Sequence, residues 1–307
     1  MLIQIKAIII LLLLLFQNCK GQHQNIITKE QYNKISKSVK SYDYNPRYSV
    51  RIKNYECAYE IYVNDMLITS RFETGTGMGI VPFPQYILKS GNQRLKVKVL
   101  PVYKSSEVEG IAIGKDAVLN IDIFHEEFGK FKETSVLKFV LPEKAQQLPY
   151  YELDTVFEAK VPYVLDGWSK GADLSKEDPK KLEQEVLEVY KRFKKAFEQK
   201  DVATIATMIY NREKEIAQAF FFVSGKEGSY DNGWETLEKE TNSVKNIKPL
   251  ENYKMRFFGD GKMVSLLRTD GKFLDYPAFM GETDDSFEFY GLYLHRPSPG
   301  APLEPIR

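Results

Sequence analysis

Residues 59–68, with the sequence YEIYVNDMLI, decide the first half of the fold. Apolar and polar side chains alternate up to Val63, and Asn64 and Asp65 separate this run from a second apolar run. Two residues that tolerate positive φ between apolar runs are typical of a tight β-hairpin. Residues 94–99 (RLKVKV) repeat the period of two, with one apolar and one basic face. These patterns predict antiparallel strands.

Strand-like segments continue through residues 47–165. Further apolar runs at residues 111–113, 118–124 and 136–141 follow each other at short spacing, with turn formers between them. Because one sheet cannot cover its own apolar face, this spacing predicts an all-β sandwich of two sheets. The glycine cluster at residues 75–79 (GTGMG) is expected to form a mobile loop, since neither a helix nor a Lys-Ser/Thr pair follows it to hold a phosphate.

One family resemblance supports the sandwich. The segment from YVND at residues 62–65 to YILKSGNQRLKVKV at residues 86–99 resembles the jelly-roll, galactose-binding-like modules. The resemblance implies a jelly-roll fold for this part. The Gly-x-Asn signature in it is a structural turn, so it implies no particular ligand.

The hydrophobic period changes from two to 3.6 near residue 178. Asp178 and Pro179 are suited to an N-cap and a first helical position. A helix of about five turns is predicted by one apolar stripe, formed by Leu182, Val186, Val189, Tyr190, Phe193, Ala196 and Phe197. Helices are also expected at residues 202–210, 213–223 and 234–241, then strands at 253–258, 262–267 and 286–295. We therefore predict a linker at 166–178 and an α+β domain at 179–307, helices first and an antiparallel sheet afterwards.

A second resemblance concerns this domain. The stretch FKKAFEQKDVATI at residues 193–205, together with the long first helix and the closing sheet, is similar to the nuclear-transport-factor-2-like superfamily of cone-shaped α+β domains. The resemblance implies a C-terminal cavity. It implies no activity, because that superfamily contains enzymes and non-enzymes.

The first residues indicate export. Lys6 precedes ten apolar residues, 7–16, and then Cys19. Ten helical residues cover about half of a hydrocarbon core, so a signal peptide at 1–18 is favoured over a membrane span. The sequence LFQNCKGQ at residues 15–22 resembles a bacterial lipobox, which implies lipidation (palmitate) of Cys19 and a membrane-anchored envelope lipoprotein. Cleavage without a lipid and a retained anchor are the alternatives, and residues 19–46 are expected to be a polar tether.

The amino-acid composition limits the kinds of functional site that the chain is expected to contain. With 43 basic and 42 acidic residues the net charge is +1, which gives no support for nucleic-acid binding. Two Cys and three His argue against a metal site, and we expect no cofactor. Acylation of Cys19 would leave Cys57 as the one remaining thiol, and no motif supplies the histidine partner that a catalytic thiol needs.

Few residues stand out as site candidates. His295, near the end of the last predicted strand, is the best-placed single base for a cavity. We nevertheless expect His295→Ala to leave any reaction rate within about tenfold. Tyr150, Tyr151, Tyr163 and Trp168 lie near the domain boundary in the sequence and could form a stacking platform for a sugar or peptide.

These patterns favour a non-enzymatic envelope lipoprotein that binds a protein or glycan partner. The alternatives are a hydrolase or isomerase with its site in the C-terminal cavity, and an immunity-type protein that neutralises an envelope toxin. A pocket with two converging titratable groups in the C-terminal domain would favour the enzyme. An exposed apolar patch on the sandwich would favour the binding protein.

Overall fold

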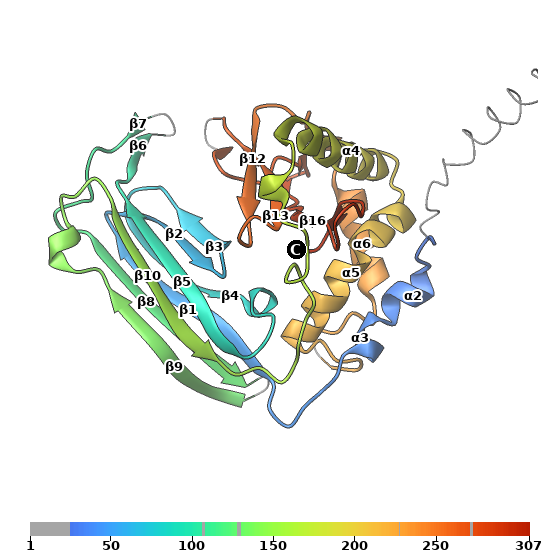
Figure 1. Ribbon diagram of the computed structural model, residues 1–307, viewed down its shortest axis with the longest axis horizontal. Helices are drawn as coiled ribbons and strands as arrows, with labels where there is room; N and C mark the ends of the chain where they lie inside the picture. The colour runs from blue at the N-terminus through green and yellow to red at the C-terminus, as the bar shows by residue number, and fades with distance from the viewer. Residues whose placement is uncertain (1–24, 106–107, 128–129, 227, 271–272) are drawn as a thin grey trace, which may run out of the picture.

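The computed structural model describes residues 25–105, 108–127, 130–226, 228–270 and 273–307. The expected signal peptide and Cys19 lie outside these residues. The fold is β-rich, with antiparallel sheets and a few helices. Figure 1 shows the first strands on one side of the molecule and the long helices on the other, with β12 and β13 between them. None of the described helices has the length and apolar character needed to cross a membrane.

The first half of the chain forms two facing four-stranded sheets. Its strands are β1 (Pro46–Tyr55), β2 (Ala58–Val63), β3 (Met66–Arg71), β4 (Thr76–Pro82), β5 (Gly91–Leu100), β6 (Tyr103–Ser105), β7 (Val108–Glu109), β8 (Val118–Glu127), β9 (Lys130–Val140) and β10 (Tyr151–Ala159). The orders are β4-β1-β8-β9 and β10-β5-β2-β3, and β6 pairs with β7. Val50, Ile61, Val97 and Ile121 lie between the two sheets, where the period-two pattern buries them.

The hairpin predicted at residues 59–68 is confirmed. Asn64 and Asp65 have φ of 51° and 64°, and they join β2 to β3. The Asn64 amide then donates hydrogen bonds of 2.8 Å to the Tyr86 carbonyl and to the Gln93 side chain. This turn is therefore held against the start of β5.

The glycine cluster at residues 75–79 is part of an edge strand and not a loop. In β4, residues 76–82 pair antiparallel with residues 49–55 of β1. A Cβ on Gly77 would overlap the Oδ1 of the buried Asn54, so a residue without a side chain is needed there. The expectation of a mobile loop was wrong because glycine here permits close packing.

The second half holds three main helices, then two small sheets. The helices are α4 (Pro179–Glu198), α5 (Val202–Phe220) and α6 (Gly233–Ser243), and the strands are β11 (Asn246–Ile247), β12 (Tyr253–Phe258), β13 (Met263–Arg268), β14 (Met280–Glu282), β15 (Phe287–Phe289), β16 (Leu294–His295) and β17 (Glu304–Pro305). The sheet orders are β11-β14-β15 and β12-β13-β16-β17. The apolar stripe predicted for α4 is buried along its length.

Two element boundaries differ from expectation. Helix α5 is continuous, whereas we expected two helices; Asn211 and Arg212 lie within it, since neither is a glycine or a proline that would end a helix. The strand expected at 286–295 is divided into β15 and β16, which belong to different sheets.

The segment expected to be a tether is packed where the structure describes it. Residues 29–38 form α2 (Lys29–Asn33) and α3 (Ile35–Ser38), and a Thr28–Gln31 capping box begins α2. Tyr32, Ile35 and Val39 are buried in the same core as α4 and α5. Their spacing of three and four residues gives one apolar face. That face is narrow, but α5 and α6 cover it.

The expected linker at 166–178 is also packed. Trp168 is 5% exposed and joins a cluster with Met66, Met263 and Ile306, in which the two halves meet. Leu174 is fully buried in the core around α4. These contacts make the segment part of the interface.

Candidate ligand-binding cavity

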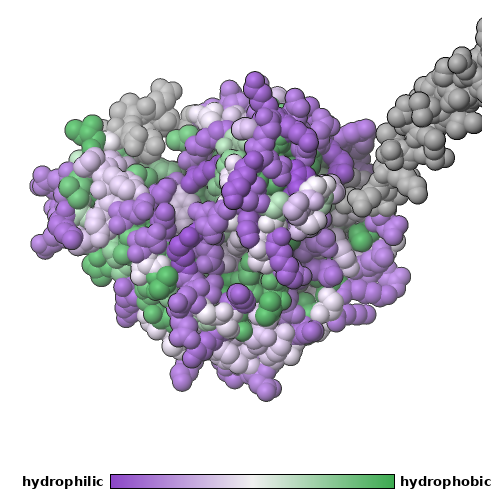
Figure 2. All heavy atoms as spheres, viewed as in Figure 1, coloured by the Kyte–Doolittle hydropathy of each residue, from purple (hydrophilic) through white to green (hydrophobic). Residues whose placement is uncertain are grey.

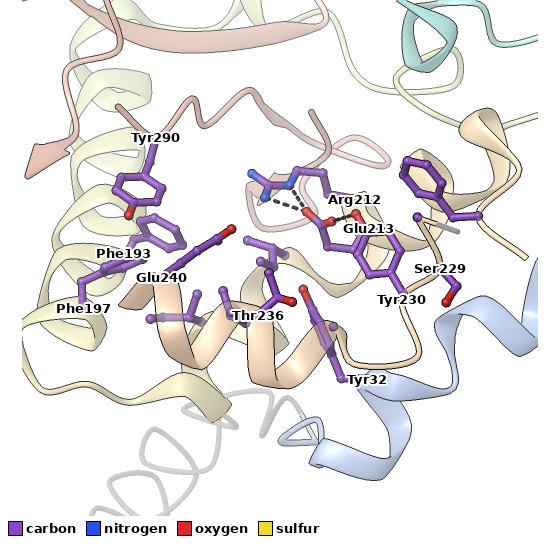
Figure 3. Close-up of a pocket in the computed structure, with 16 residues that line it drawn as sticks. Tyr32, Phe193, Phe197, Arg212, Glu213, Ser229, Tyr230, Thr236, Glu240 and Tyr290 are labelled. Carbon is purple, nitrogen blue, oxygen red and sulfur yellow. Dashed lines mark hydrogen bonds and ion pairs between the residues drawn. The ribbon is translucent and has the colours of Figure 1, made fainter. Parts of the chain in front are cut away.

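A cavity of about 320 Å³ lies among α4, α5, α6 and the segment before α6. Figure 3 shows Phe197 and Tyr290 on one side of the cavity and Tyr230 and Ser229 on the other. Its aromatic walls comprise Tyr32, Phe193, Phe197, Phe222, Tyr230 and Tyr290, and its polar side chains are those of Arg212, Glu213, Ser229, Thr236 and Glu240. An apolar cavity with a few polar groups is the usual form of a small-ligand site.

The aromatic wall nearest α4 follows from helical spacing. Phe193 and Phe197 are four residues apart, so their rings lie on the same face of α4, with centroids 5.0 Å apart. The ring of Tyr290 lies 4.7 Å from that of Phe197. Phe279 packs against all three rings from the core side. This packing fixes the wall in place.

A buried ionic network occupies the opposite side of the cavity. The Glu213 carboxylate, in a residue 7% exposed, accepts hydrogen bonds from Arg212 through Nε at 2.7 Å and through a terminal nitrogen at 2.6 Å. Its other oxygen accepts a short hydrogen bond from the Tyr230 hydroxyl. Burial and the Glu213 charge raise the pKa of Tyr230, so this phenol stays protonated as a donor. Both oxygens of Glu213 are therefore engaged.

Glu240 is the second carboxylate of the cavity. Figure 3 shows its side chain extending from α6 into the space between Tyr290 and the Arg212–Glu213 pair. Burial, and then the negative charge of Glu213, raises the pKa of Glu240 above its ordinary value. Among the described residues, no side chain or backbone group donates a hydrogen bond to its carboxylate. Glu240 is an exposed residue of α6, so its carboxylate faces solvent as well as the cavity.

His295 does not line this cavity. It is 4% exposed in β16, which pairs with β13 on one side and with β17 on the other. Its Nε2 lies 3.2 Å from the Glu304 carboxylate, and its Nδ1 has no hydrogen-bond partner within the part of the chain that the structure describes. Gly171 approaches that Nδ1 from the segment that joins the halves. The structure places His295 in packing and not in a cavity.

The four aromatic candidates are divided between two places. Tyr150 and Tyr151 lie at the start of β10, and Tyr163 and Trp168 follow its end. The nine residues of β10 span about 30 Å, so the two pairs are far apart. Tyr163 is buried and donates to the Pro84 carbonyl at 3.2 Å.

The other three rings have separate environments. Tyr151 stacks on Phe139, Tyr150 is 42% exposed, and the Arg307 guanidinium covers Trp168 at 5.2 Å. The structure brings no common platform together from these residues.

A second hollow lies at the sandwich end of the molecule. Its lining residues are Tyr44, Tyr48, His125, Val136, Glu158 and Lys160. The Tyr44 hydroxyl is 2.9 Å from Nδ1 of His125, and burial lowers the pKa of His125, which favours a neutral imidazole. Opposite charges on Glu158 and Lys160 leave this hollow without net charge.

The structure also bears on a reactive thiol and on a metal site. Cys57 is fully buried, its Sγ lies 3.4 Å from the Val118 carbonyl, and burial raises the pKa of its thiol to about 11. That thiol is unreactive by environment. Within the described ranges, no three His, Cys, Asp or Glu side chains gather closely enough to hold a metal ion.

Sequence reasoning missed the cavity residues, although one signal was present. Ile205, Ile209, Glu213 and Ala217 recur every four residues on α5, and all four are buried. A charged residue within an apolar stripe indicates a paired or functional group. Glu240 and Tyr32 had no comparable signal, because only the packing of α2 and α6 on α5 brings them to the cavity.

No protein-family model, curated protein or solved structure matches this chain.

Proposed function

We propose that this protein is a non-enzymatic binding protein of the bacterial envelope, anchored as a lipoprotein through Cys19. In this proposal, the cavity among α4, α5 and α6 receives part of a protein or glycan partner. The observation that carries the proposal is the form of the cavity: aromatic walls, one free carboxylate and a closed ionic network. The first half of the chain would form a jelly-roll domain and the second a nuclear-transport-factor-2-like domain.

The polar groups of the cavity are better suited to binding than to catalysis. General acid–base chemistry needs groups that can exchange protons with a substrate. Glu213 cannot do so while Arg212 and Tyr230 occupy both of its oxygens. The Ser229 hydroxyl donates to Asp231 at 3.0 Å, and the described residues that line the cavity include neither histidine nor cysteine. A nucleophile with an adjacent base is therefore missing from this lining.

The sandwich surface offers a weaker site. The large apolar side chains that are most exposed on its strands are Met78 on β4 (77%), Val140 on β9 (68%) and Val156 on β10 (55%). Strands β4 and β9 are opposite edges of one sheet, and β10 belongs to the other sheet. Figure 2 shows apolar areas separated by hydrophilic residues on the face in view. The cavity is therefore the better candidate.

A cavity hydrolase or isomerase is the second candidate function. Two carboxylates, Glu213 and Glu240, share the cavity, and the pKa of Glu240 is raised. A carboxyl group with a raised pKa can act as a general acid near neutral pH. If Glu240 has this role, Glu240→Gln should abolish turnover of a processed ligand while leaving its binding intact.

Blocking the cavity tests the binding proposal. Thr236 lines the cavity at its exposed edge, so Thr236→Phe should fill space without disturbing the core. Asn242→Phe, on the exposed surface of the same helix, is the matched control. We expect a partner that co-purifies with the full-length protein from the native membrane fraction to be lost with Thr236→Phe and retained with Asn242→Phe. Retention by both variants would refute the cavity as the binding site.

Export is tested separately. Two or three acyl chains, at about 0.8 kcal/mol per buried CH₂ group, would anchor the protein stably. Cys19→Ser should therefore move the protein from the membrane pellet to the soluble fraction. Unchanged membrane association with an unprocessed N-terminus would contradict lipidation.

A further inference from the structure

We infer that the cavity binds an organic ammonium ion, with the cation beside Glu240 and its apolar body against the aromatic wall of Phe193, Phe197 and Tyr290. This inference rests on the proposed function, because it specifies what the binding cavity accepts. It follows from three observations: the charge balance of the cavity, the chemistry of its walls, and the hydrogen bonds that Glu213 already accepts from Arg212 and Tyr230.

The charge balance leaves one negative charge for a ligand. Among the described residues that line the cavity, Arg212 is the one cationic side chain, and it is paired with Glu213 through two nitrogens. Glu240 has no such partner among the described residues. The three tyrosines that line the cavity are neutral, since burial raises the pKa of each. Glu288, on β15, adds a further negative charge whose influence reaches Glu240.

The walls favour a cation over a polar neutral ligand. Phenylalanine and tyrosine rings present an electron-rich face, and a cation within about 6 Å of such a face is attracted to it. Three of these rings pack together next to Glu240. The volume of about 320 Å³ lies at the lower end for small-molecule sites. A compact ligand with one charged and one apolar end fits both features.

A bare metal ion fits the cavity poorly. Calcium takes six to eight oxygen ligands, and magnesium requires an octahedral set. The oxygens of Glu213 are already engaged by Arg212 and Tyr230, so Glu240 would supply the remaining carboxylate alone. Aromatic walls offer a metal ion no ligands, but they suit the weakly hydrated surface of an organic cation.

Matched probes test the inference on the full-length protein. At pH 7.5, isothermal titration would compare 2-phenylethylammonium with its neutral counterpart 2-phenylethanol and with the anion 3-phenylpropanoate. We expect the ammonium ion to bind at least tenfold more tightly than the alcohol. We expect the carboxylate to bind more weakly than either, because Glu240 repels it.

Two charge-removing variants on the same helix locate the interaction. Glu240→Gln should weaken binding of the ammonium ion about tenfold, to the level of the alcohol, and leave binding of the alcohol unchanged. Glu238→Gln removes an equal charge from an exposed position of α6 that does not line the cavity, so affinity should change less than twofold. Far-ultraviolet circular dichroism of each variant would verify that the fold is intact.

The pH dependence gives an independent readout. Protonation of Glu240 removes the counter-ion, so ammonium binding should fall as the pH is lowered through the pKa of Glu240. That loss should occur at a higher pH than a glutamate with an ordinary pKa would show, because partial burial and the charge of Glu213 raise the pKa of Glu240; Arg212 opposes the shift. Binding of 2-phenylethanol should not change over the same range.

The outcomes separate this inference from the function on which it rests. Equal affinity for the ammonium ion and the alcohol, or an unchanged ammonium affinity in Glu240→Gln, would overturn the ammonium inference and leave the cavity as a binding site. Binding of none of the three probes would overturn the inference. Retention of the native partner by Thr236→Phe would, in addition, overturn the proposed function.

Discussion

At the scale of single residues, Glu213 determines how the charges of the cavity are paired. It interrupts the apolar stripe of α5, and burial of its charge is tolerated because Arg212 and Tyr230 donate to it. Such a network is costly to break, since the remaining partner is left buried and unpaired. The same network is what leaves Glu240 without a cation.

Glu213→Ala should therefore destabilise the protein strongly. We expect a loss of about 3 kcal/mol, because Arg212 and Tyr230 lose their acceptor. Urea unfolding followed by circular dichroism would measure this loss. Glu188→Ala on the exposed side of α4, where Glu188 pairs with Lys191, is the control and should change stability by less than about 0.5 kcal/mol. Equal effects of the two substitutions would contradict the role given to Glu213.

Glu240→Gln, in contrast, should increase the stability of the protein at neutral pH. The pKa of Glu240 is raised in the folded state, so folding favours its protonated form and stability falls as the pH rises through that pKa. A neutral glutamine avoids this loss. We expect the thermal midpoint at pH 7 to rise by about 2 °C, a small gain because the side chain is partly exposed to solvent.

This gain should disappear below pH 4, where the wild-type carboxyl group is protonated. Glu238→Gln should show no gain at either pH, because Glu238 does not line the cavity. Differential scanning calorimetry at several pH values would make the comparison. A midpoint for Glu240→Gln below that of the wild type at pH 7 would show that the Glu240 charge is compensated.

At the scale of elements, the edge strand β4 shows how one position determines a pairing. Strand β4 contacts a single neighbour in its sheet, β1, and carries the exposed Met78 and Ile80 on its outer face. Gly77 permits β4 to lie against Asn54, whose amide donates to the Cys57 carbonyl at 3.1 Å. Within the glycine cluster, Gly77 is therefore the position that close packing requires.

Gly77→Ala and Gly79→Ala form a matched pair that tests this account. A Cβ at position 77 would overlap Asn54, whereas a Cβ at position 79 would have no atom within 4 Å. We expect Gly77→Ala to cost about 1–3 kcal/mol and Gly79→Ala to be neutral or slightly stabilising. Chemical denaturation would measure both, and hydrogen exchange of the amides in β4 would show whether the strand separates from β1.

At the scale of the whole molecule, the two halves share contacts that make them interdependent. Phe221, at the end of α5, is buried in the core of the sandwich. Asp65 accepts a hydrogen bond of 2.9 Å from the backbone of Asp260, so the hairpin turns of the two halves meet. Arg307 bonds to Glu215 at 2.7 Å and to the Gln85 carbonyl at 2.8 Å, which links α5 to the sandwich.

These contacts change the result expected for a separated second half. The change of hydrophobic period near residue 178 predicts a fragment of residues 174–307 that unfolds cooperatively. The structure shows that this fragment would lack Tyr32, Ile35 and Val39 and would expose Phe221. We therefore expect weak or non-cooperative unfolding of the fragment in calorimetry. Residues 25–307 should unfold in one sharp transition, and a sharp transition of the fragment alone would contradict the shared cores.

The local elements could be predicted from the pattern of neighbouring residues. Alternation of apolar residues and the Asn64–Asp65 pair were sufficient for the hairpin of β2 and β3, because turn geometry and side-chain period are properties of adjacent residues. The seven-residue apolar stripe of α4 could also be predicted from the sequence, since helical spacing assigns each side chain to a face of the helix.

Which elements come into contact could not be predicted from the sequence pattern. Nothing in the sequence of residues 25–46 shows that Tyr32 reaches the side of Glu213, or that His295 is enclosed between strands, because both depend on contacts between distant segments. The cavity has the same origin. Its charge balance arises where α2, α4, α5, α6 and Tyr290 converge, and a charge is neutralised or left free according to its neighbours in space, which sequence spacing does not specify.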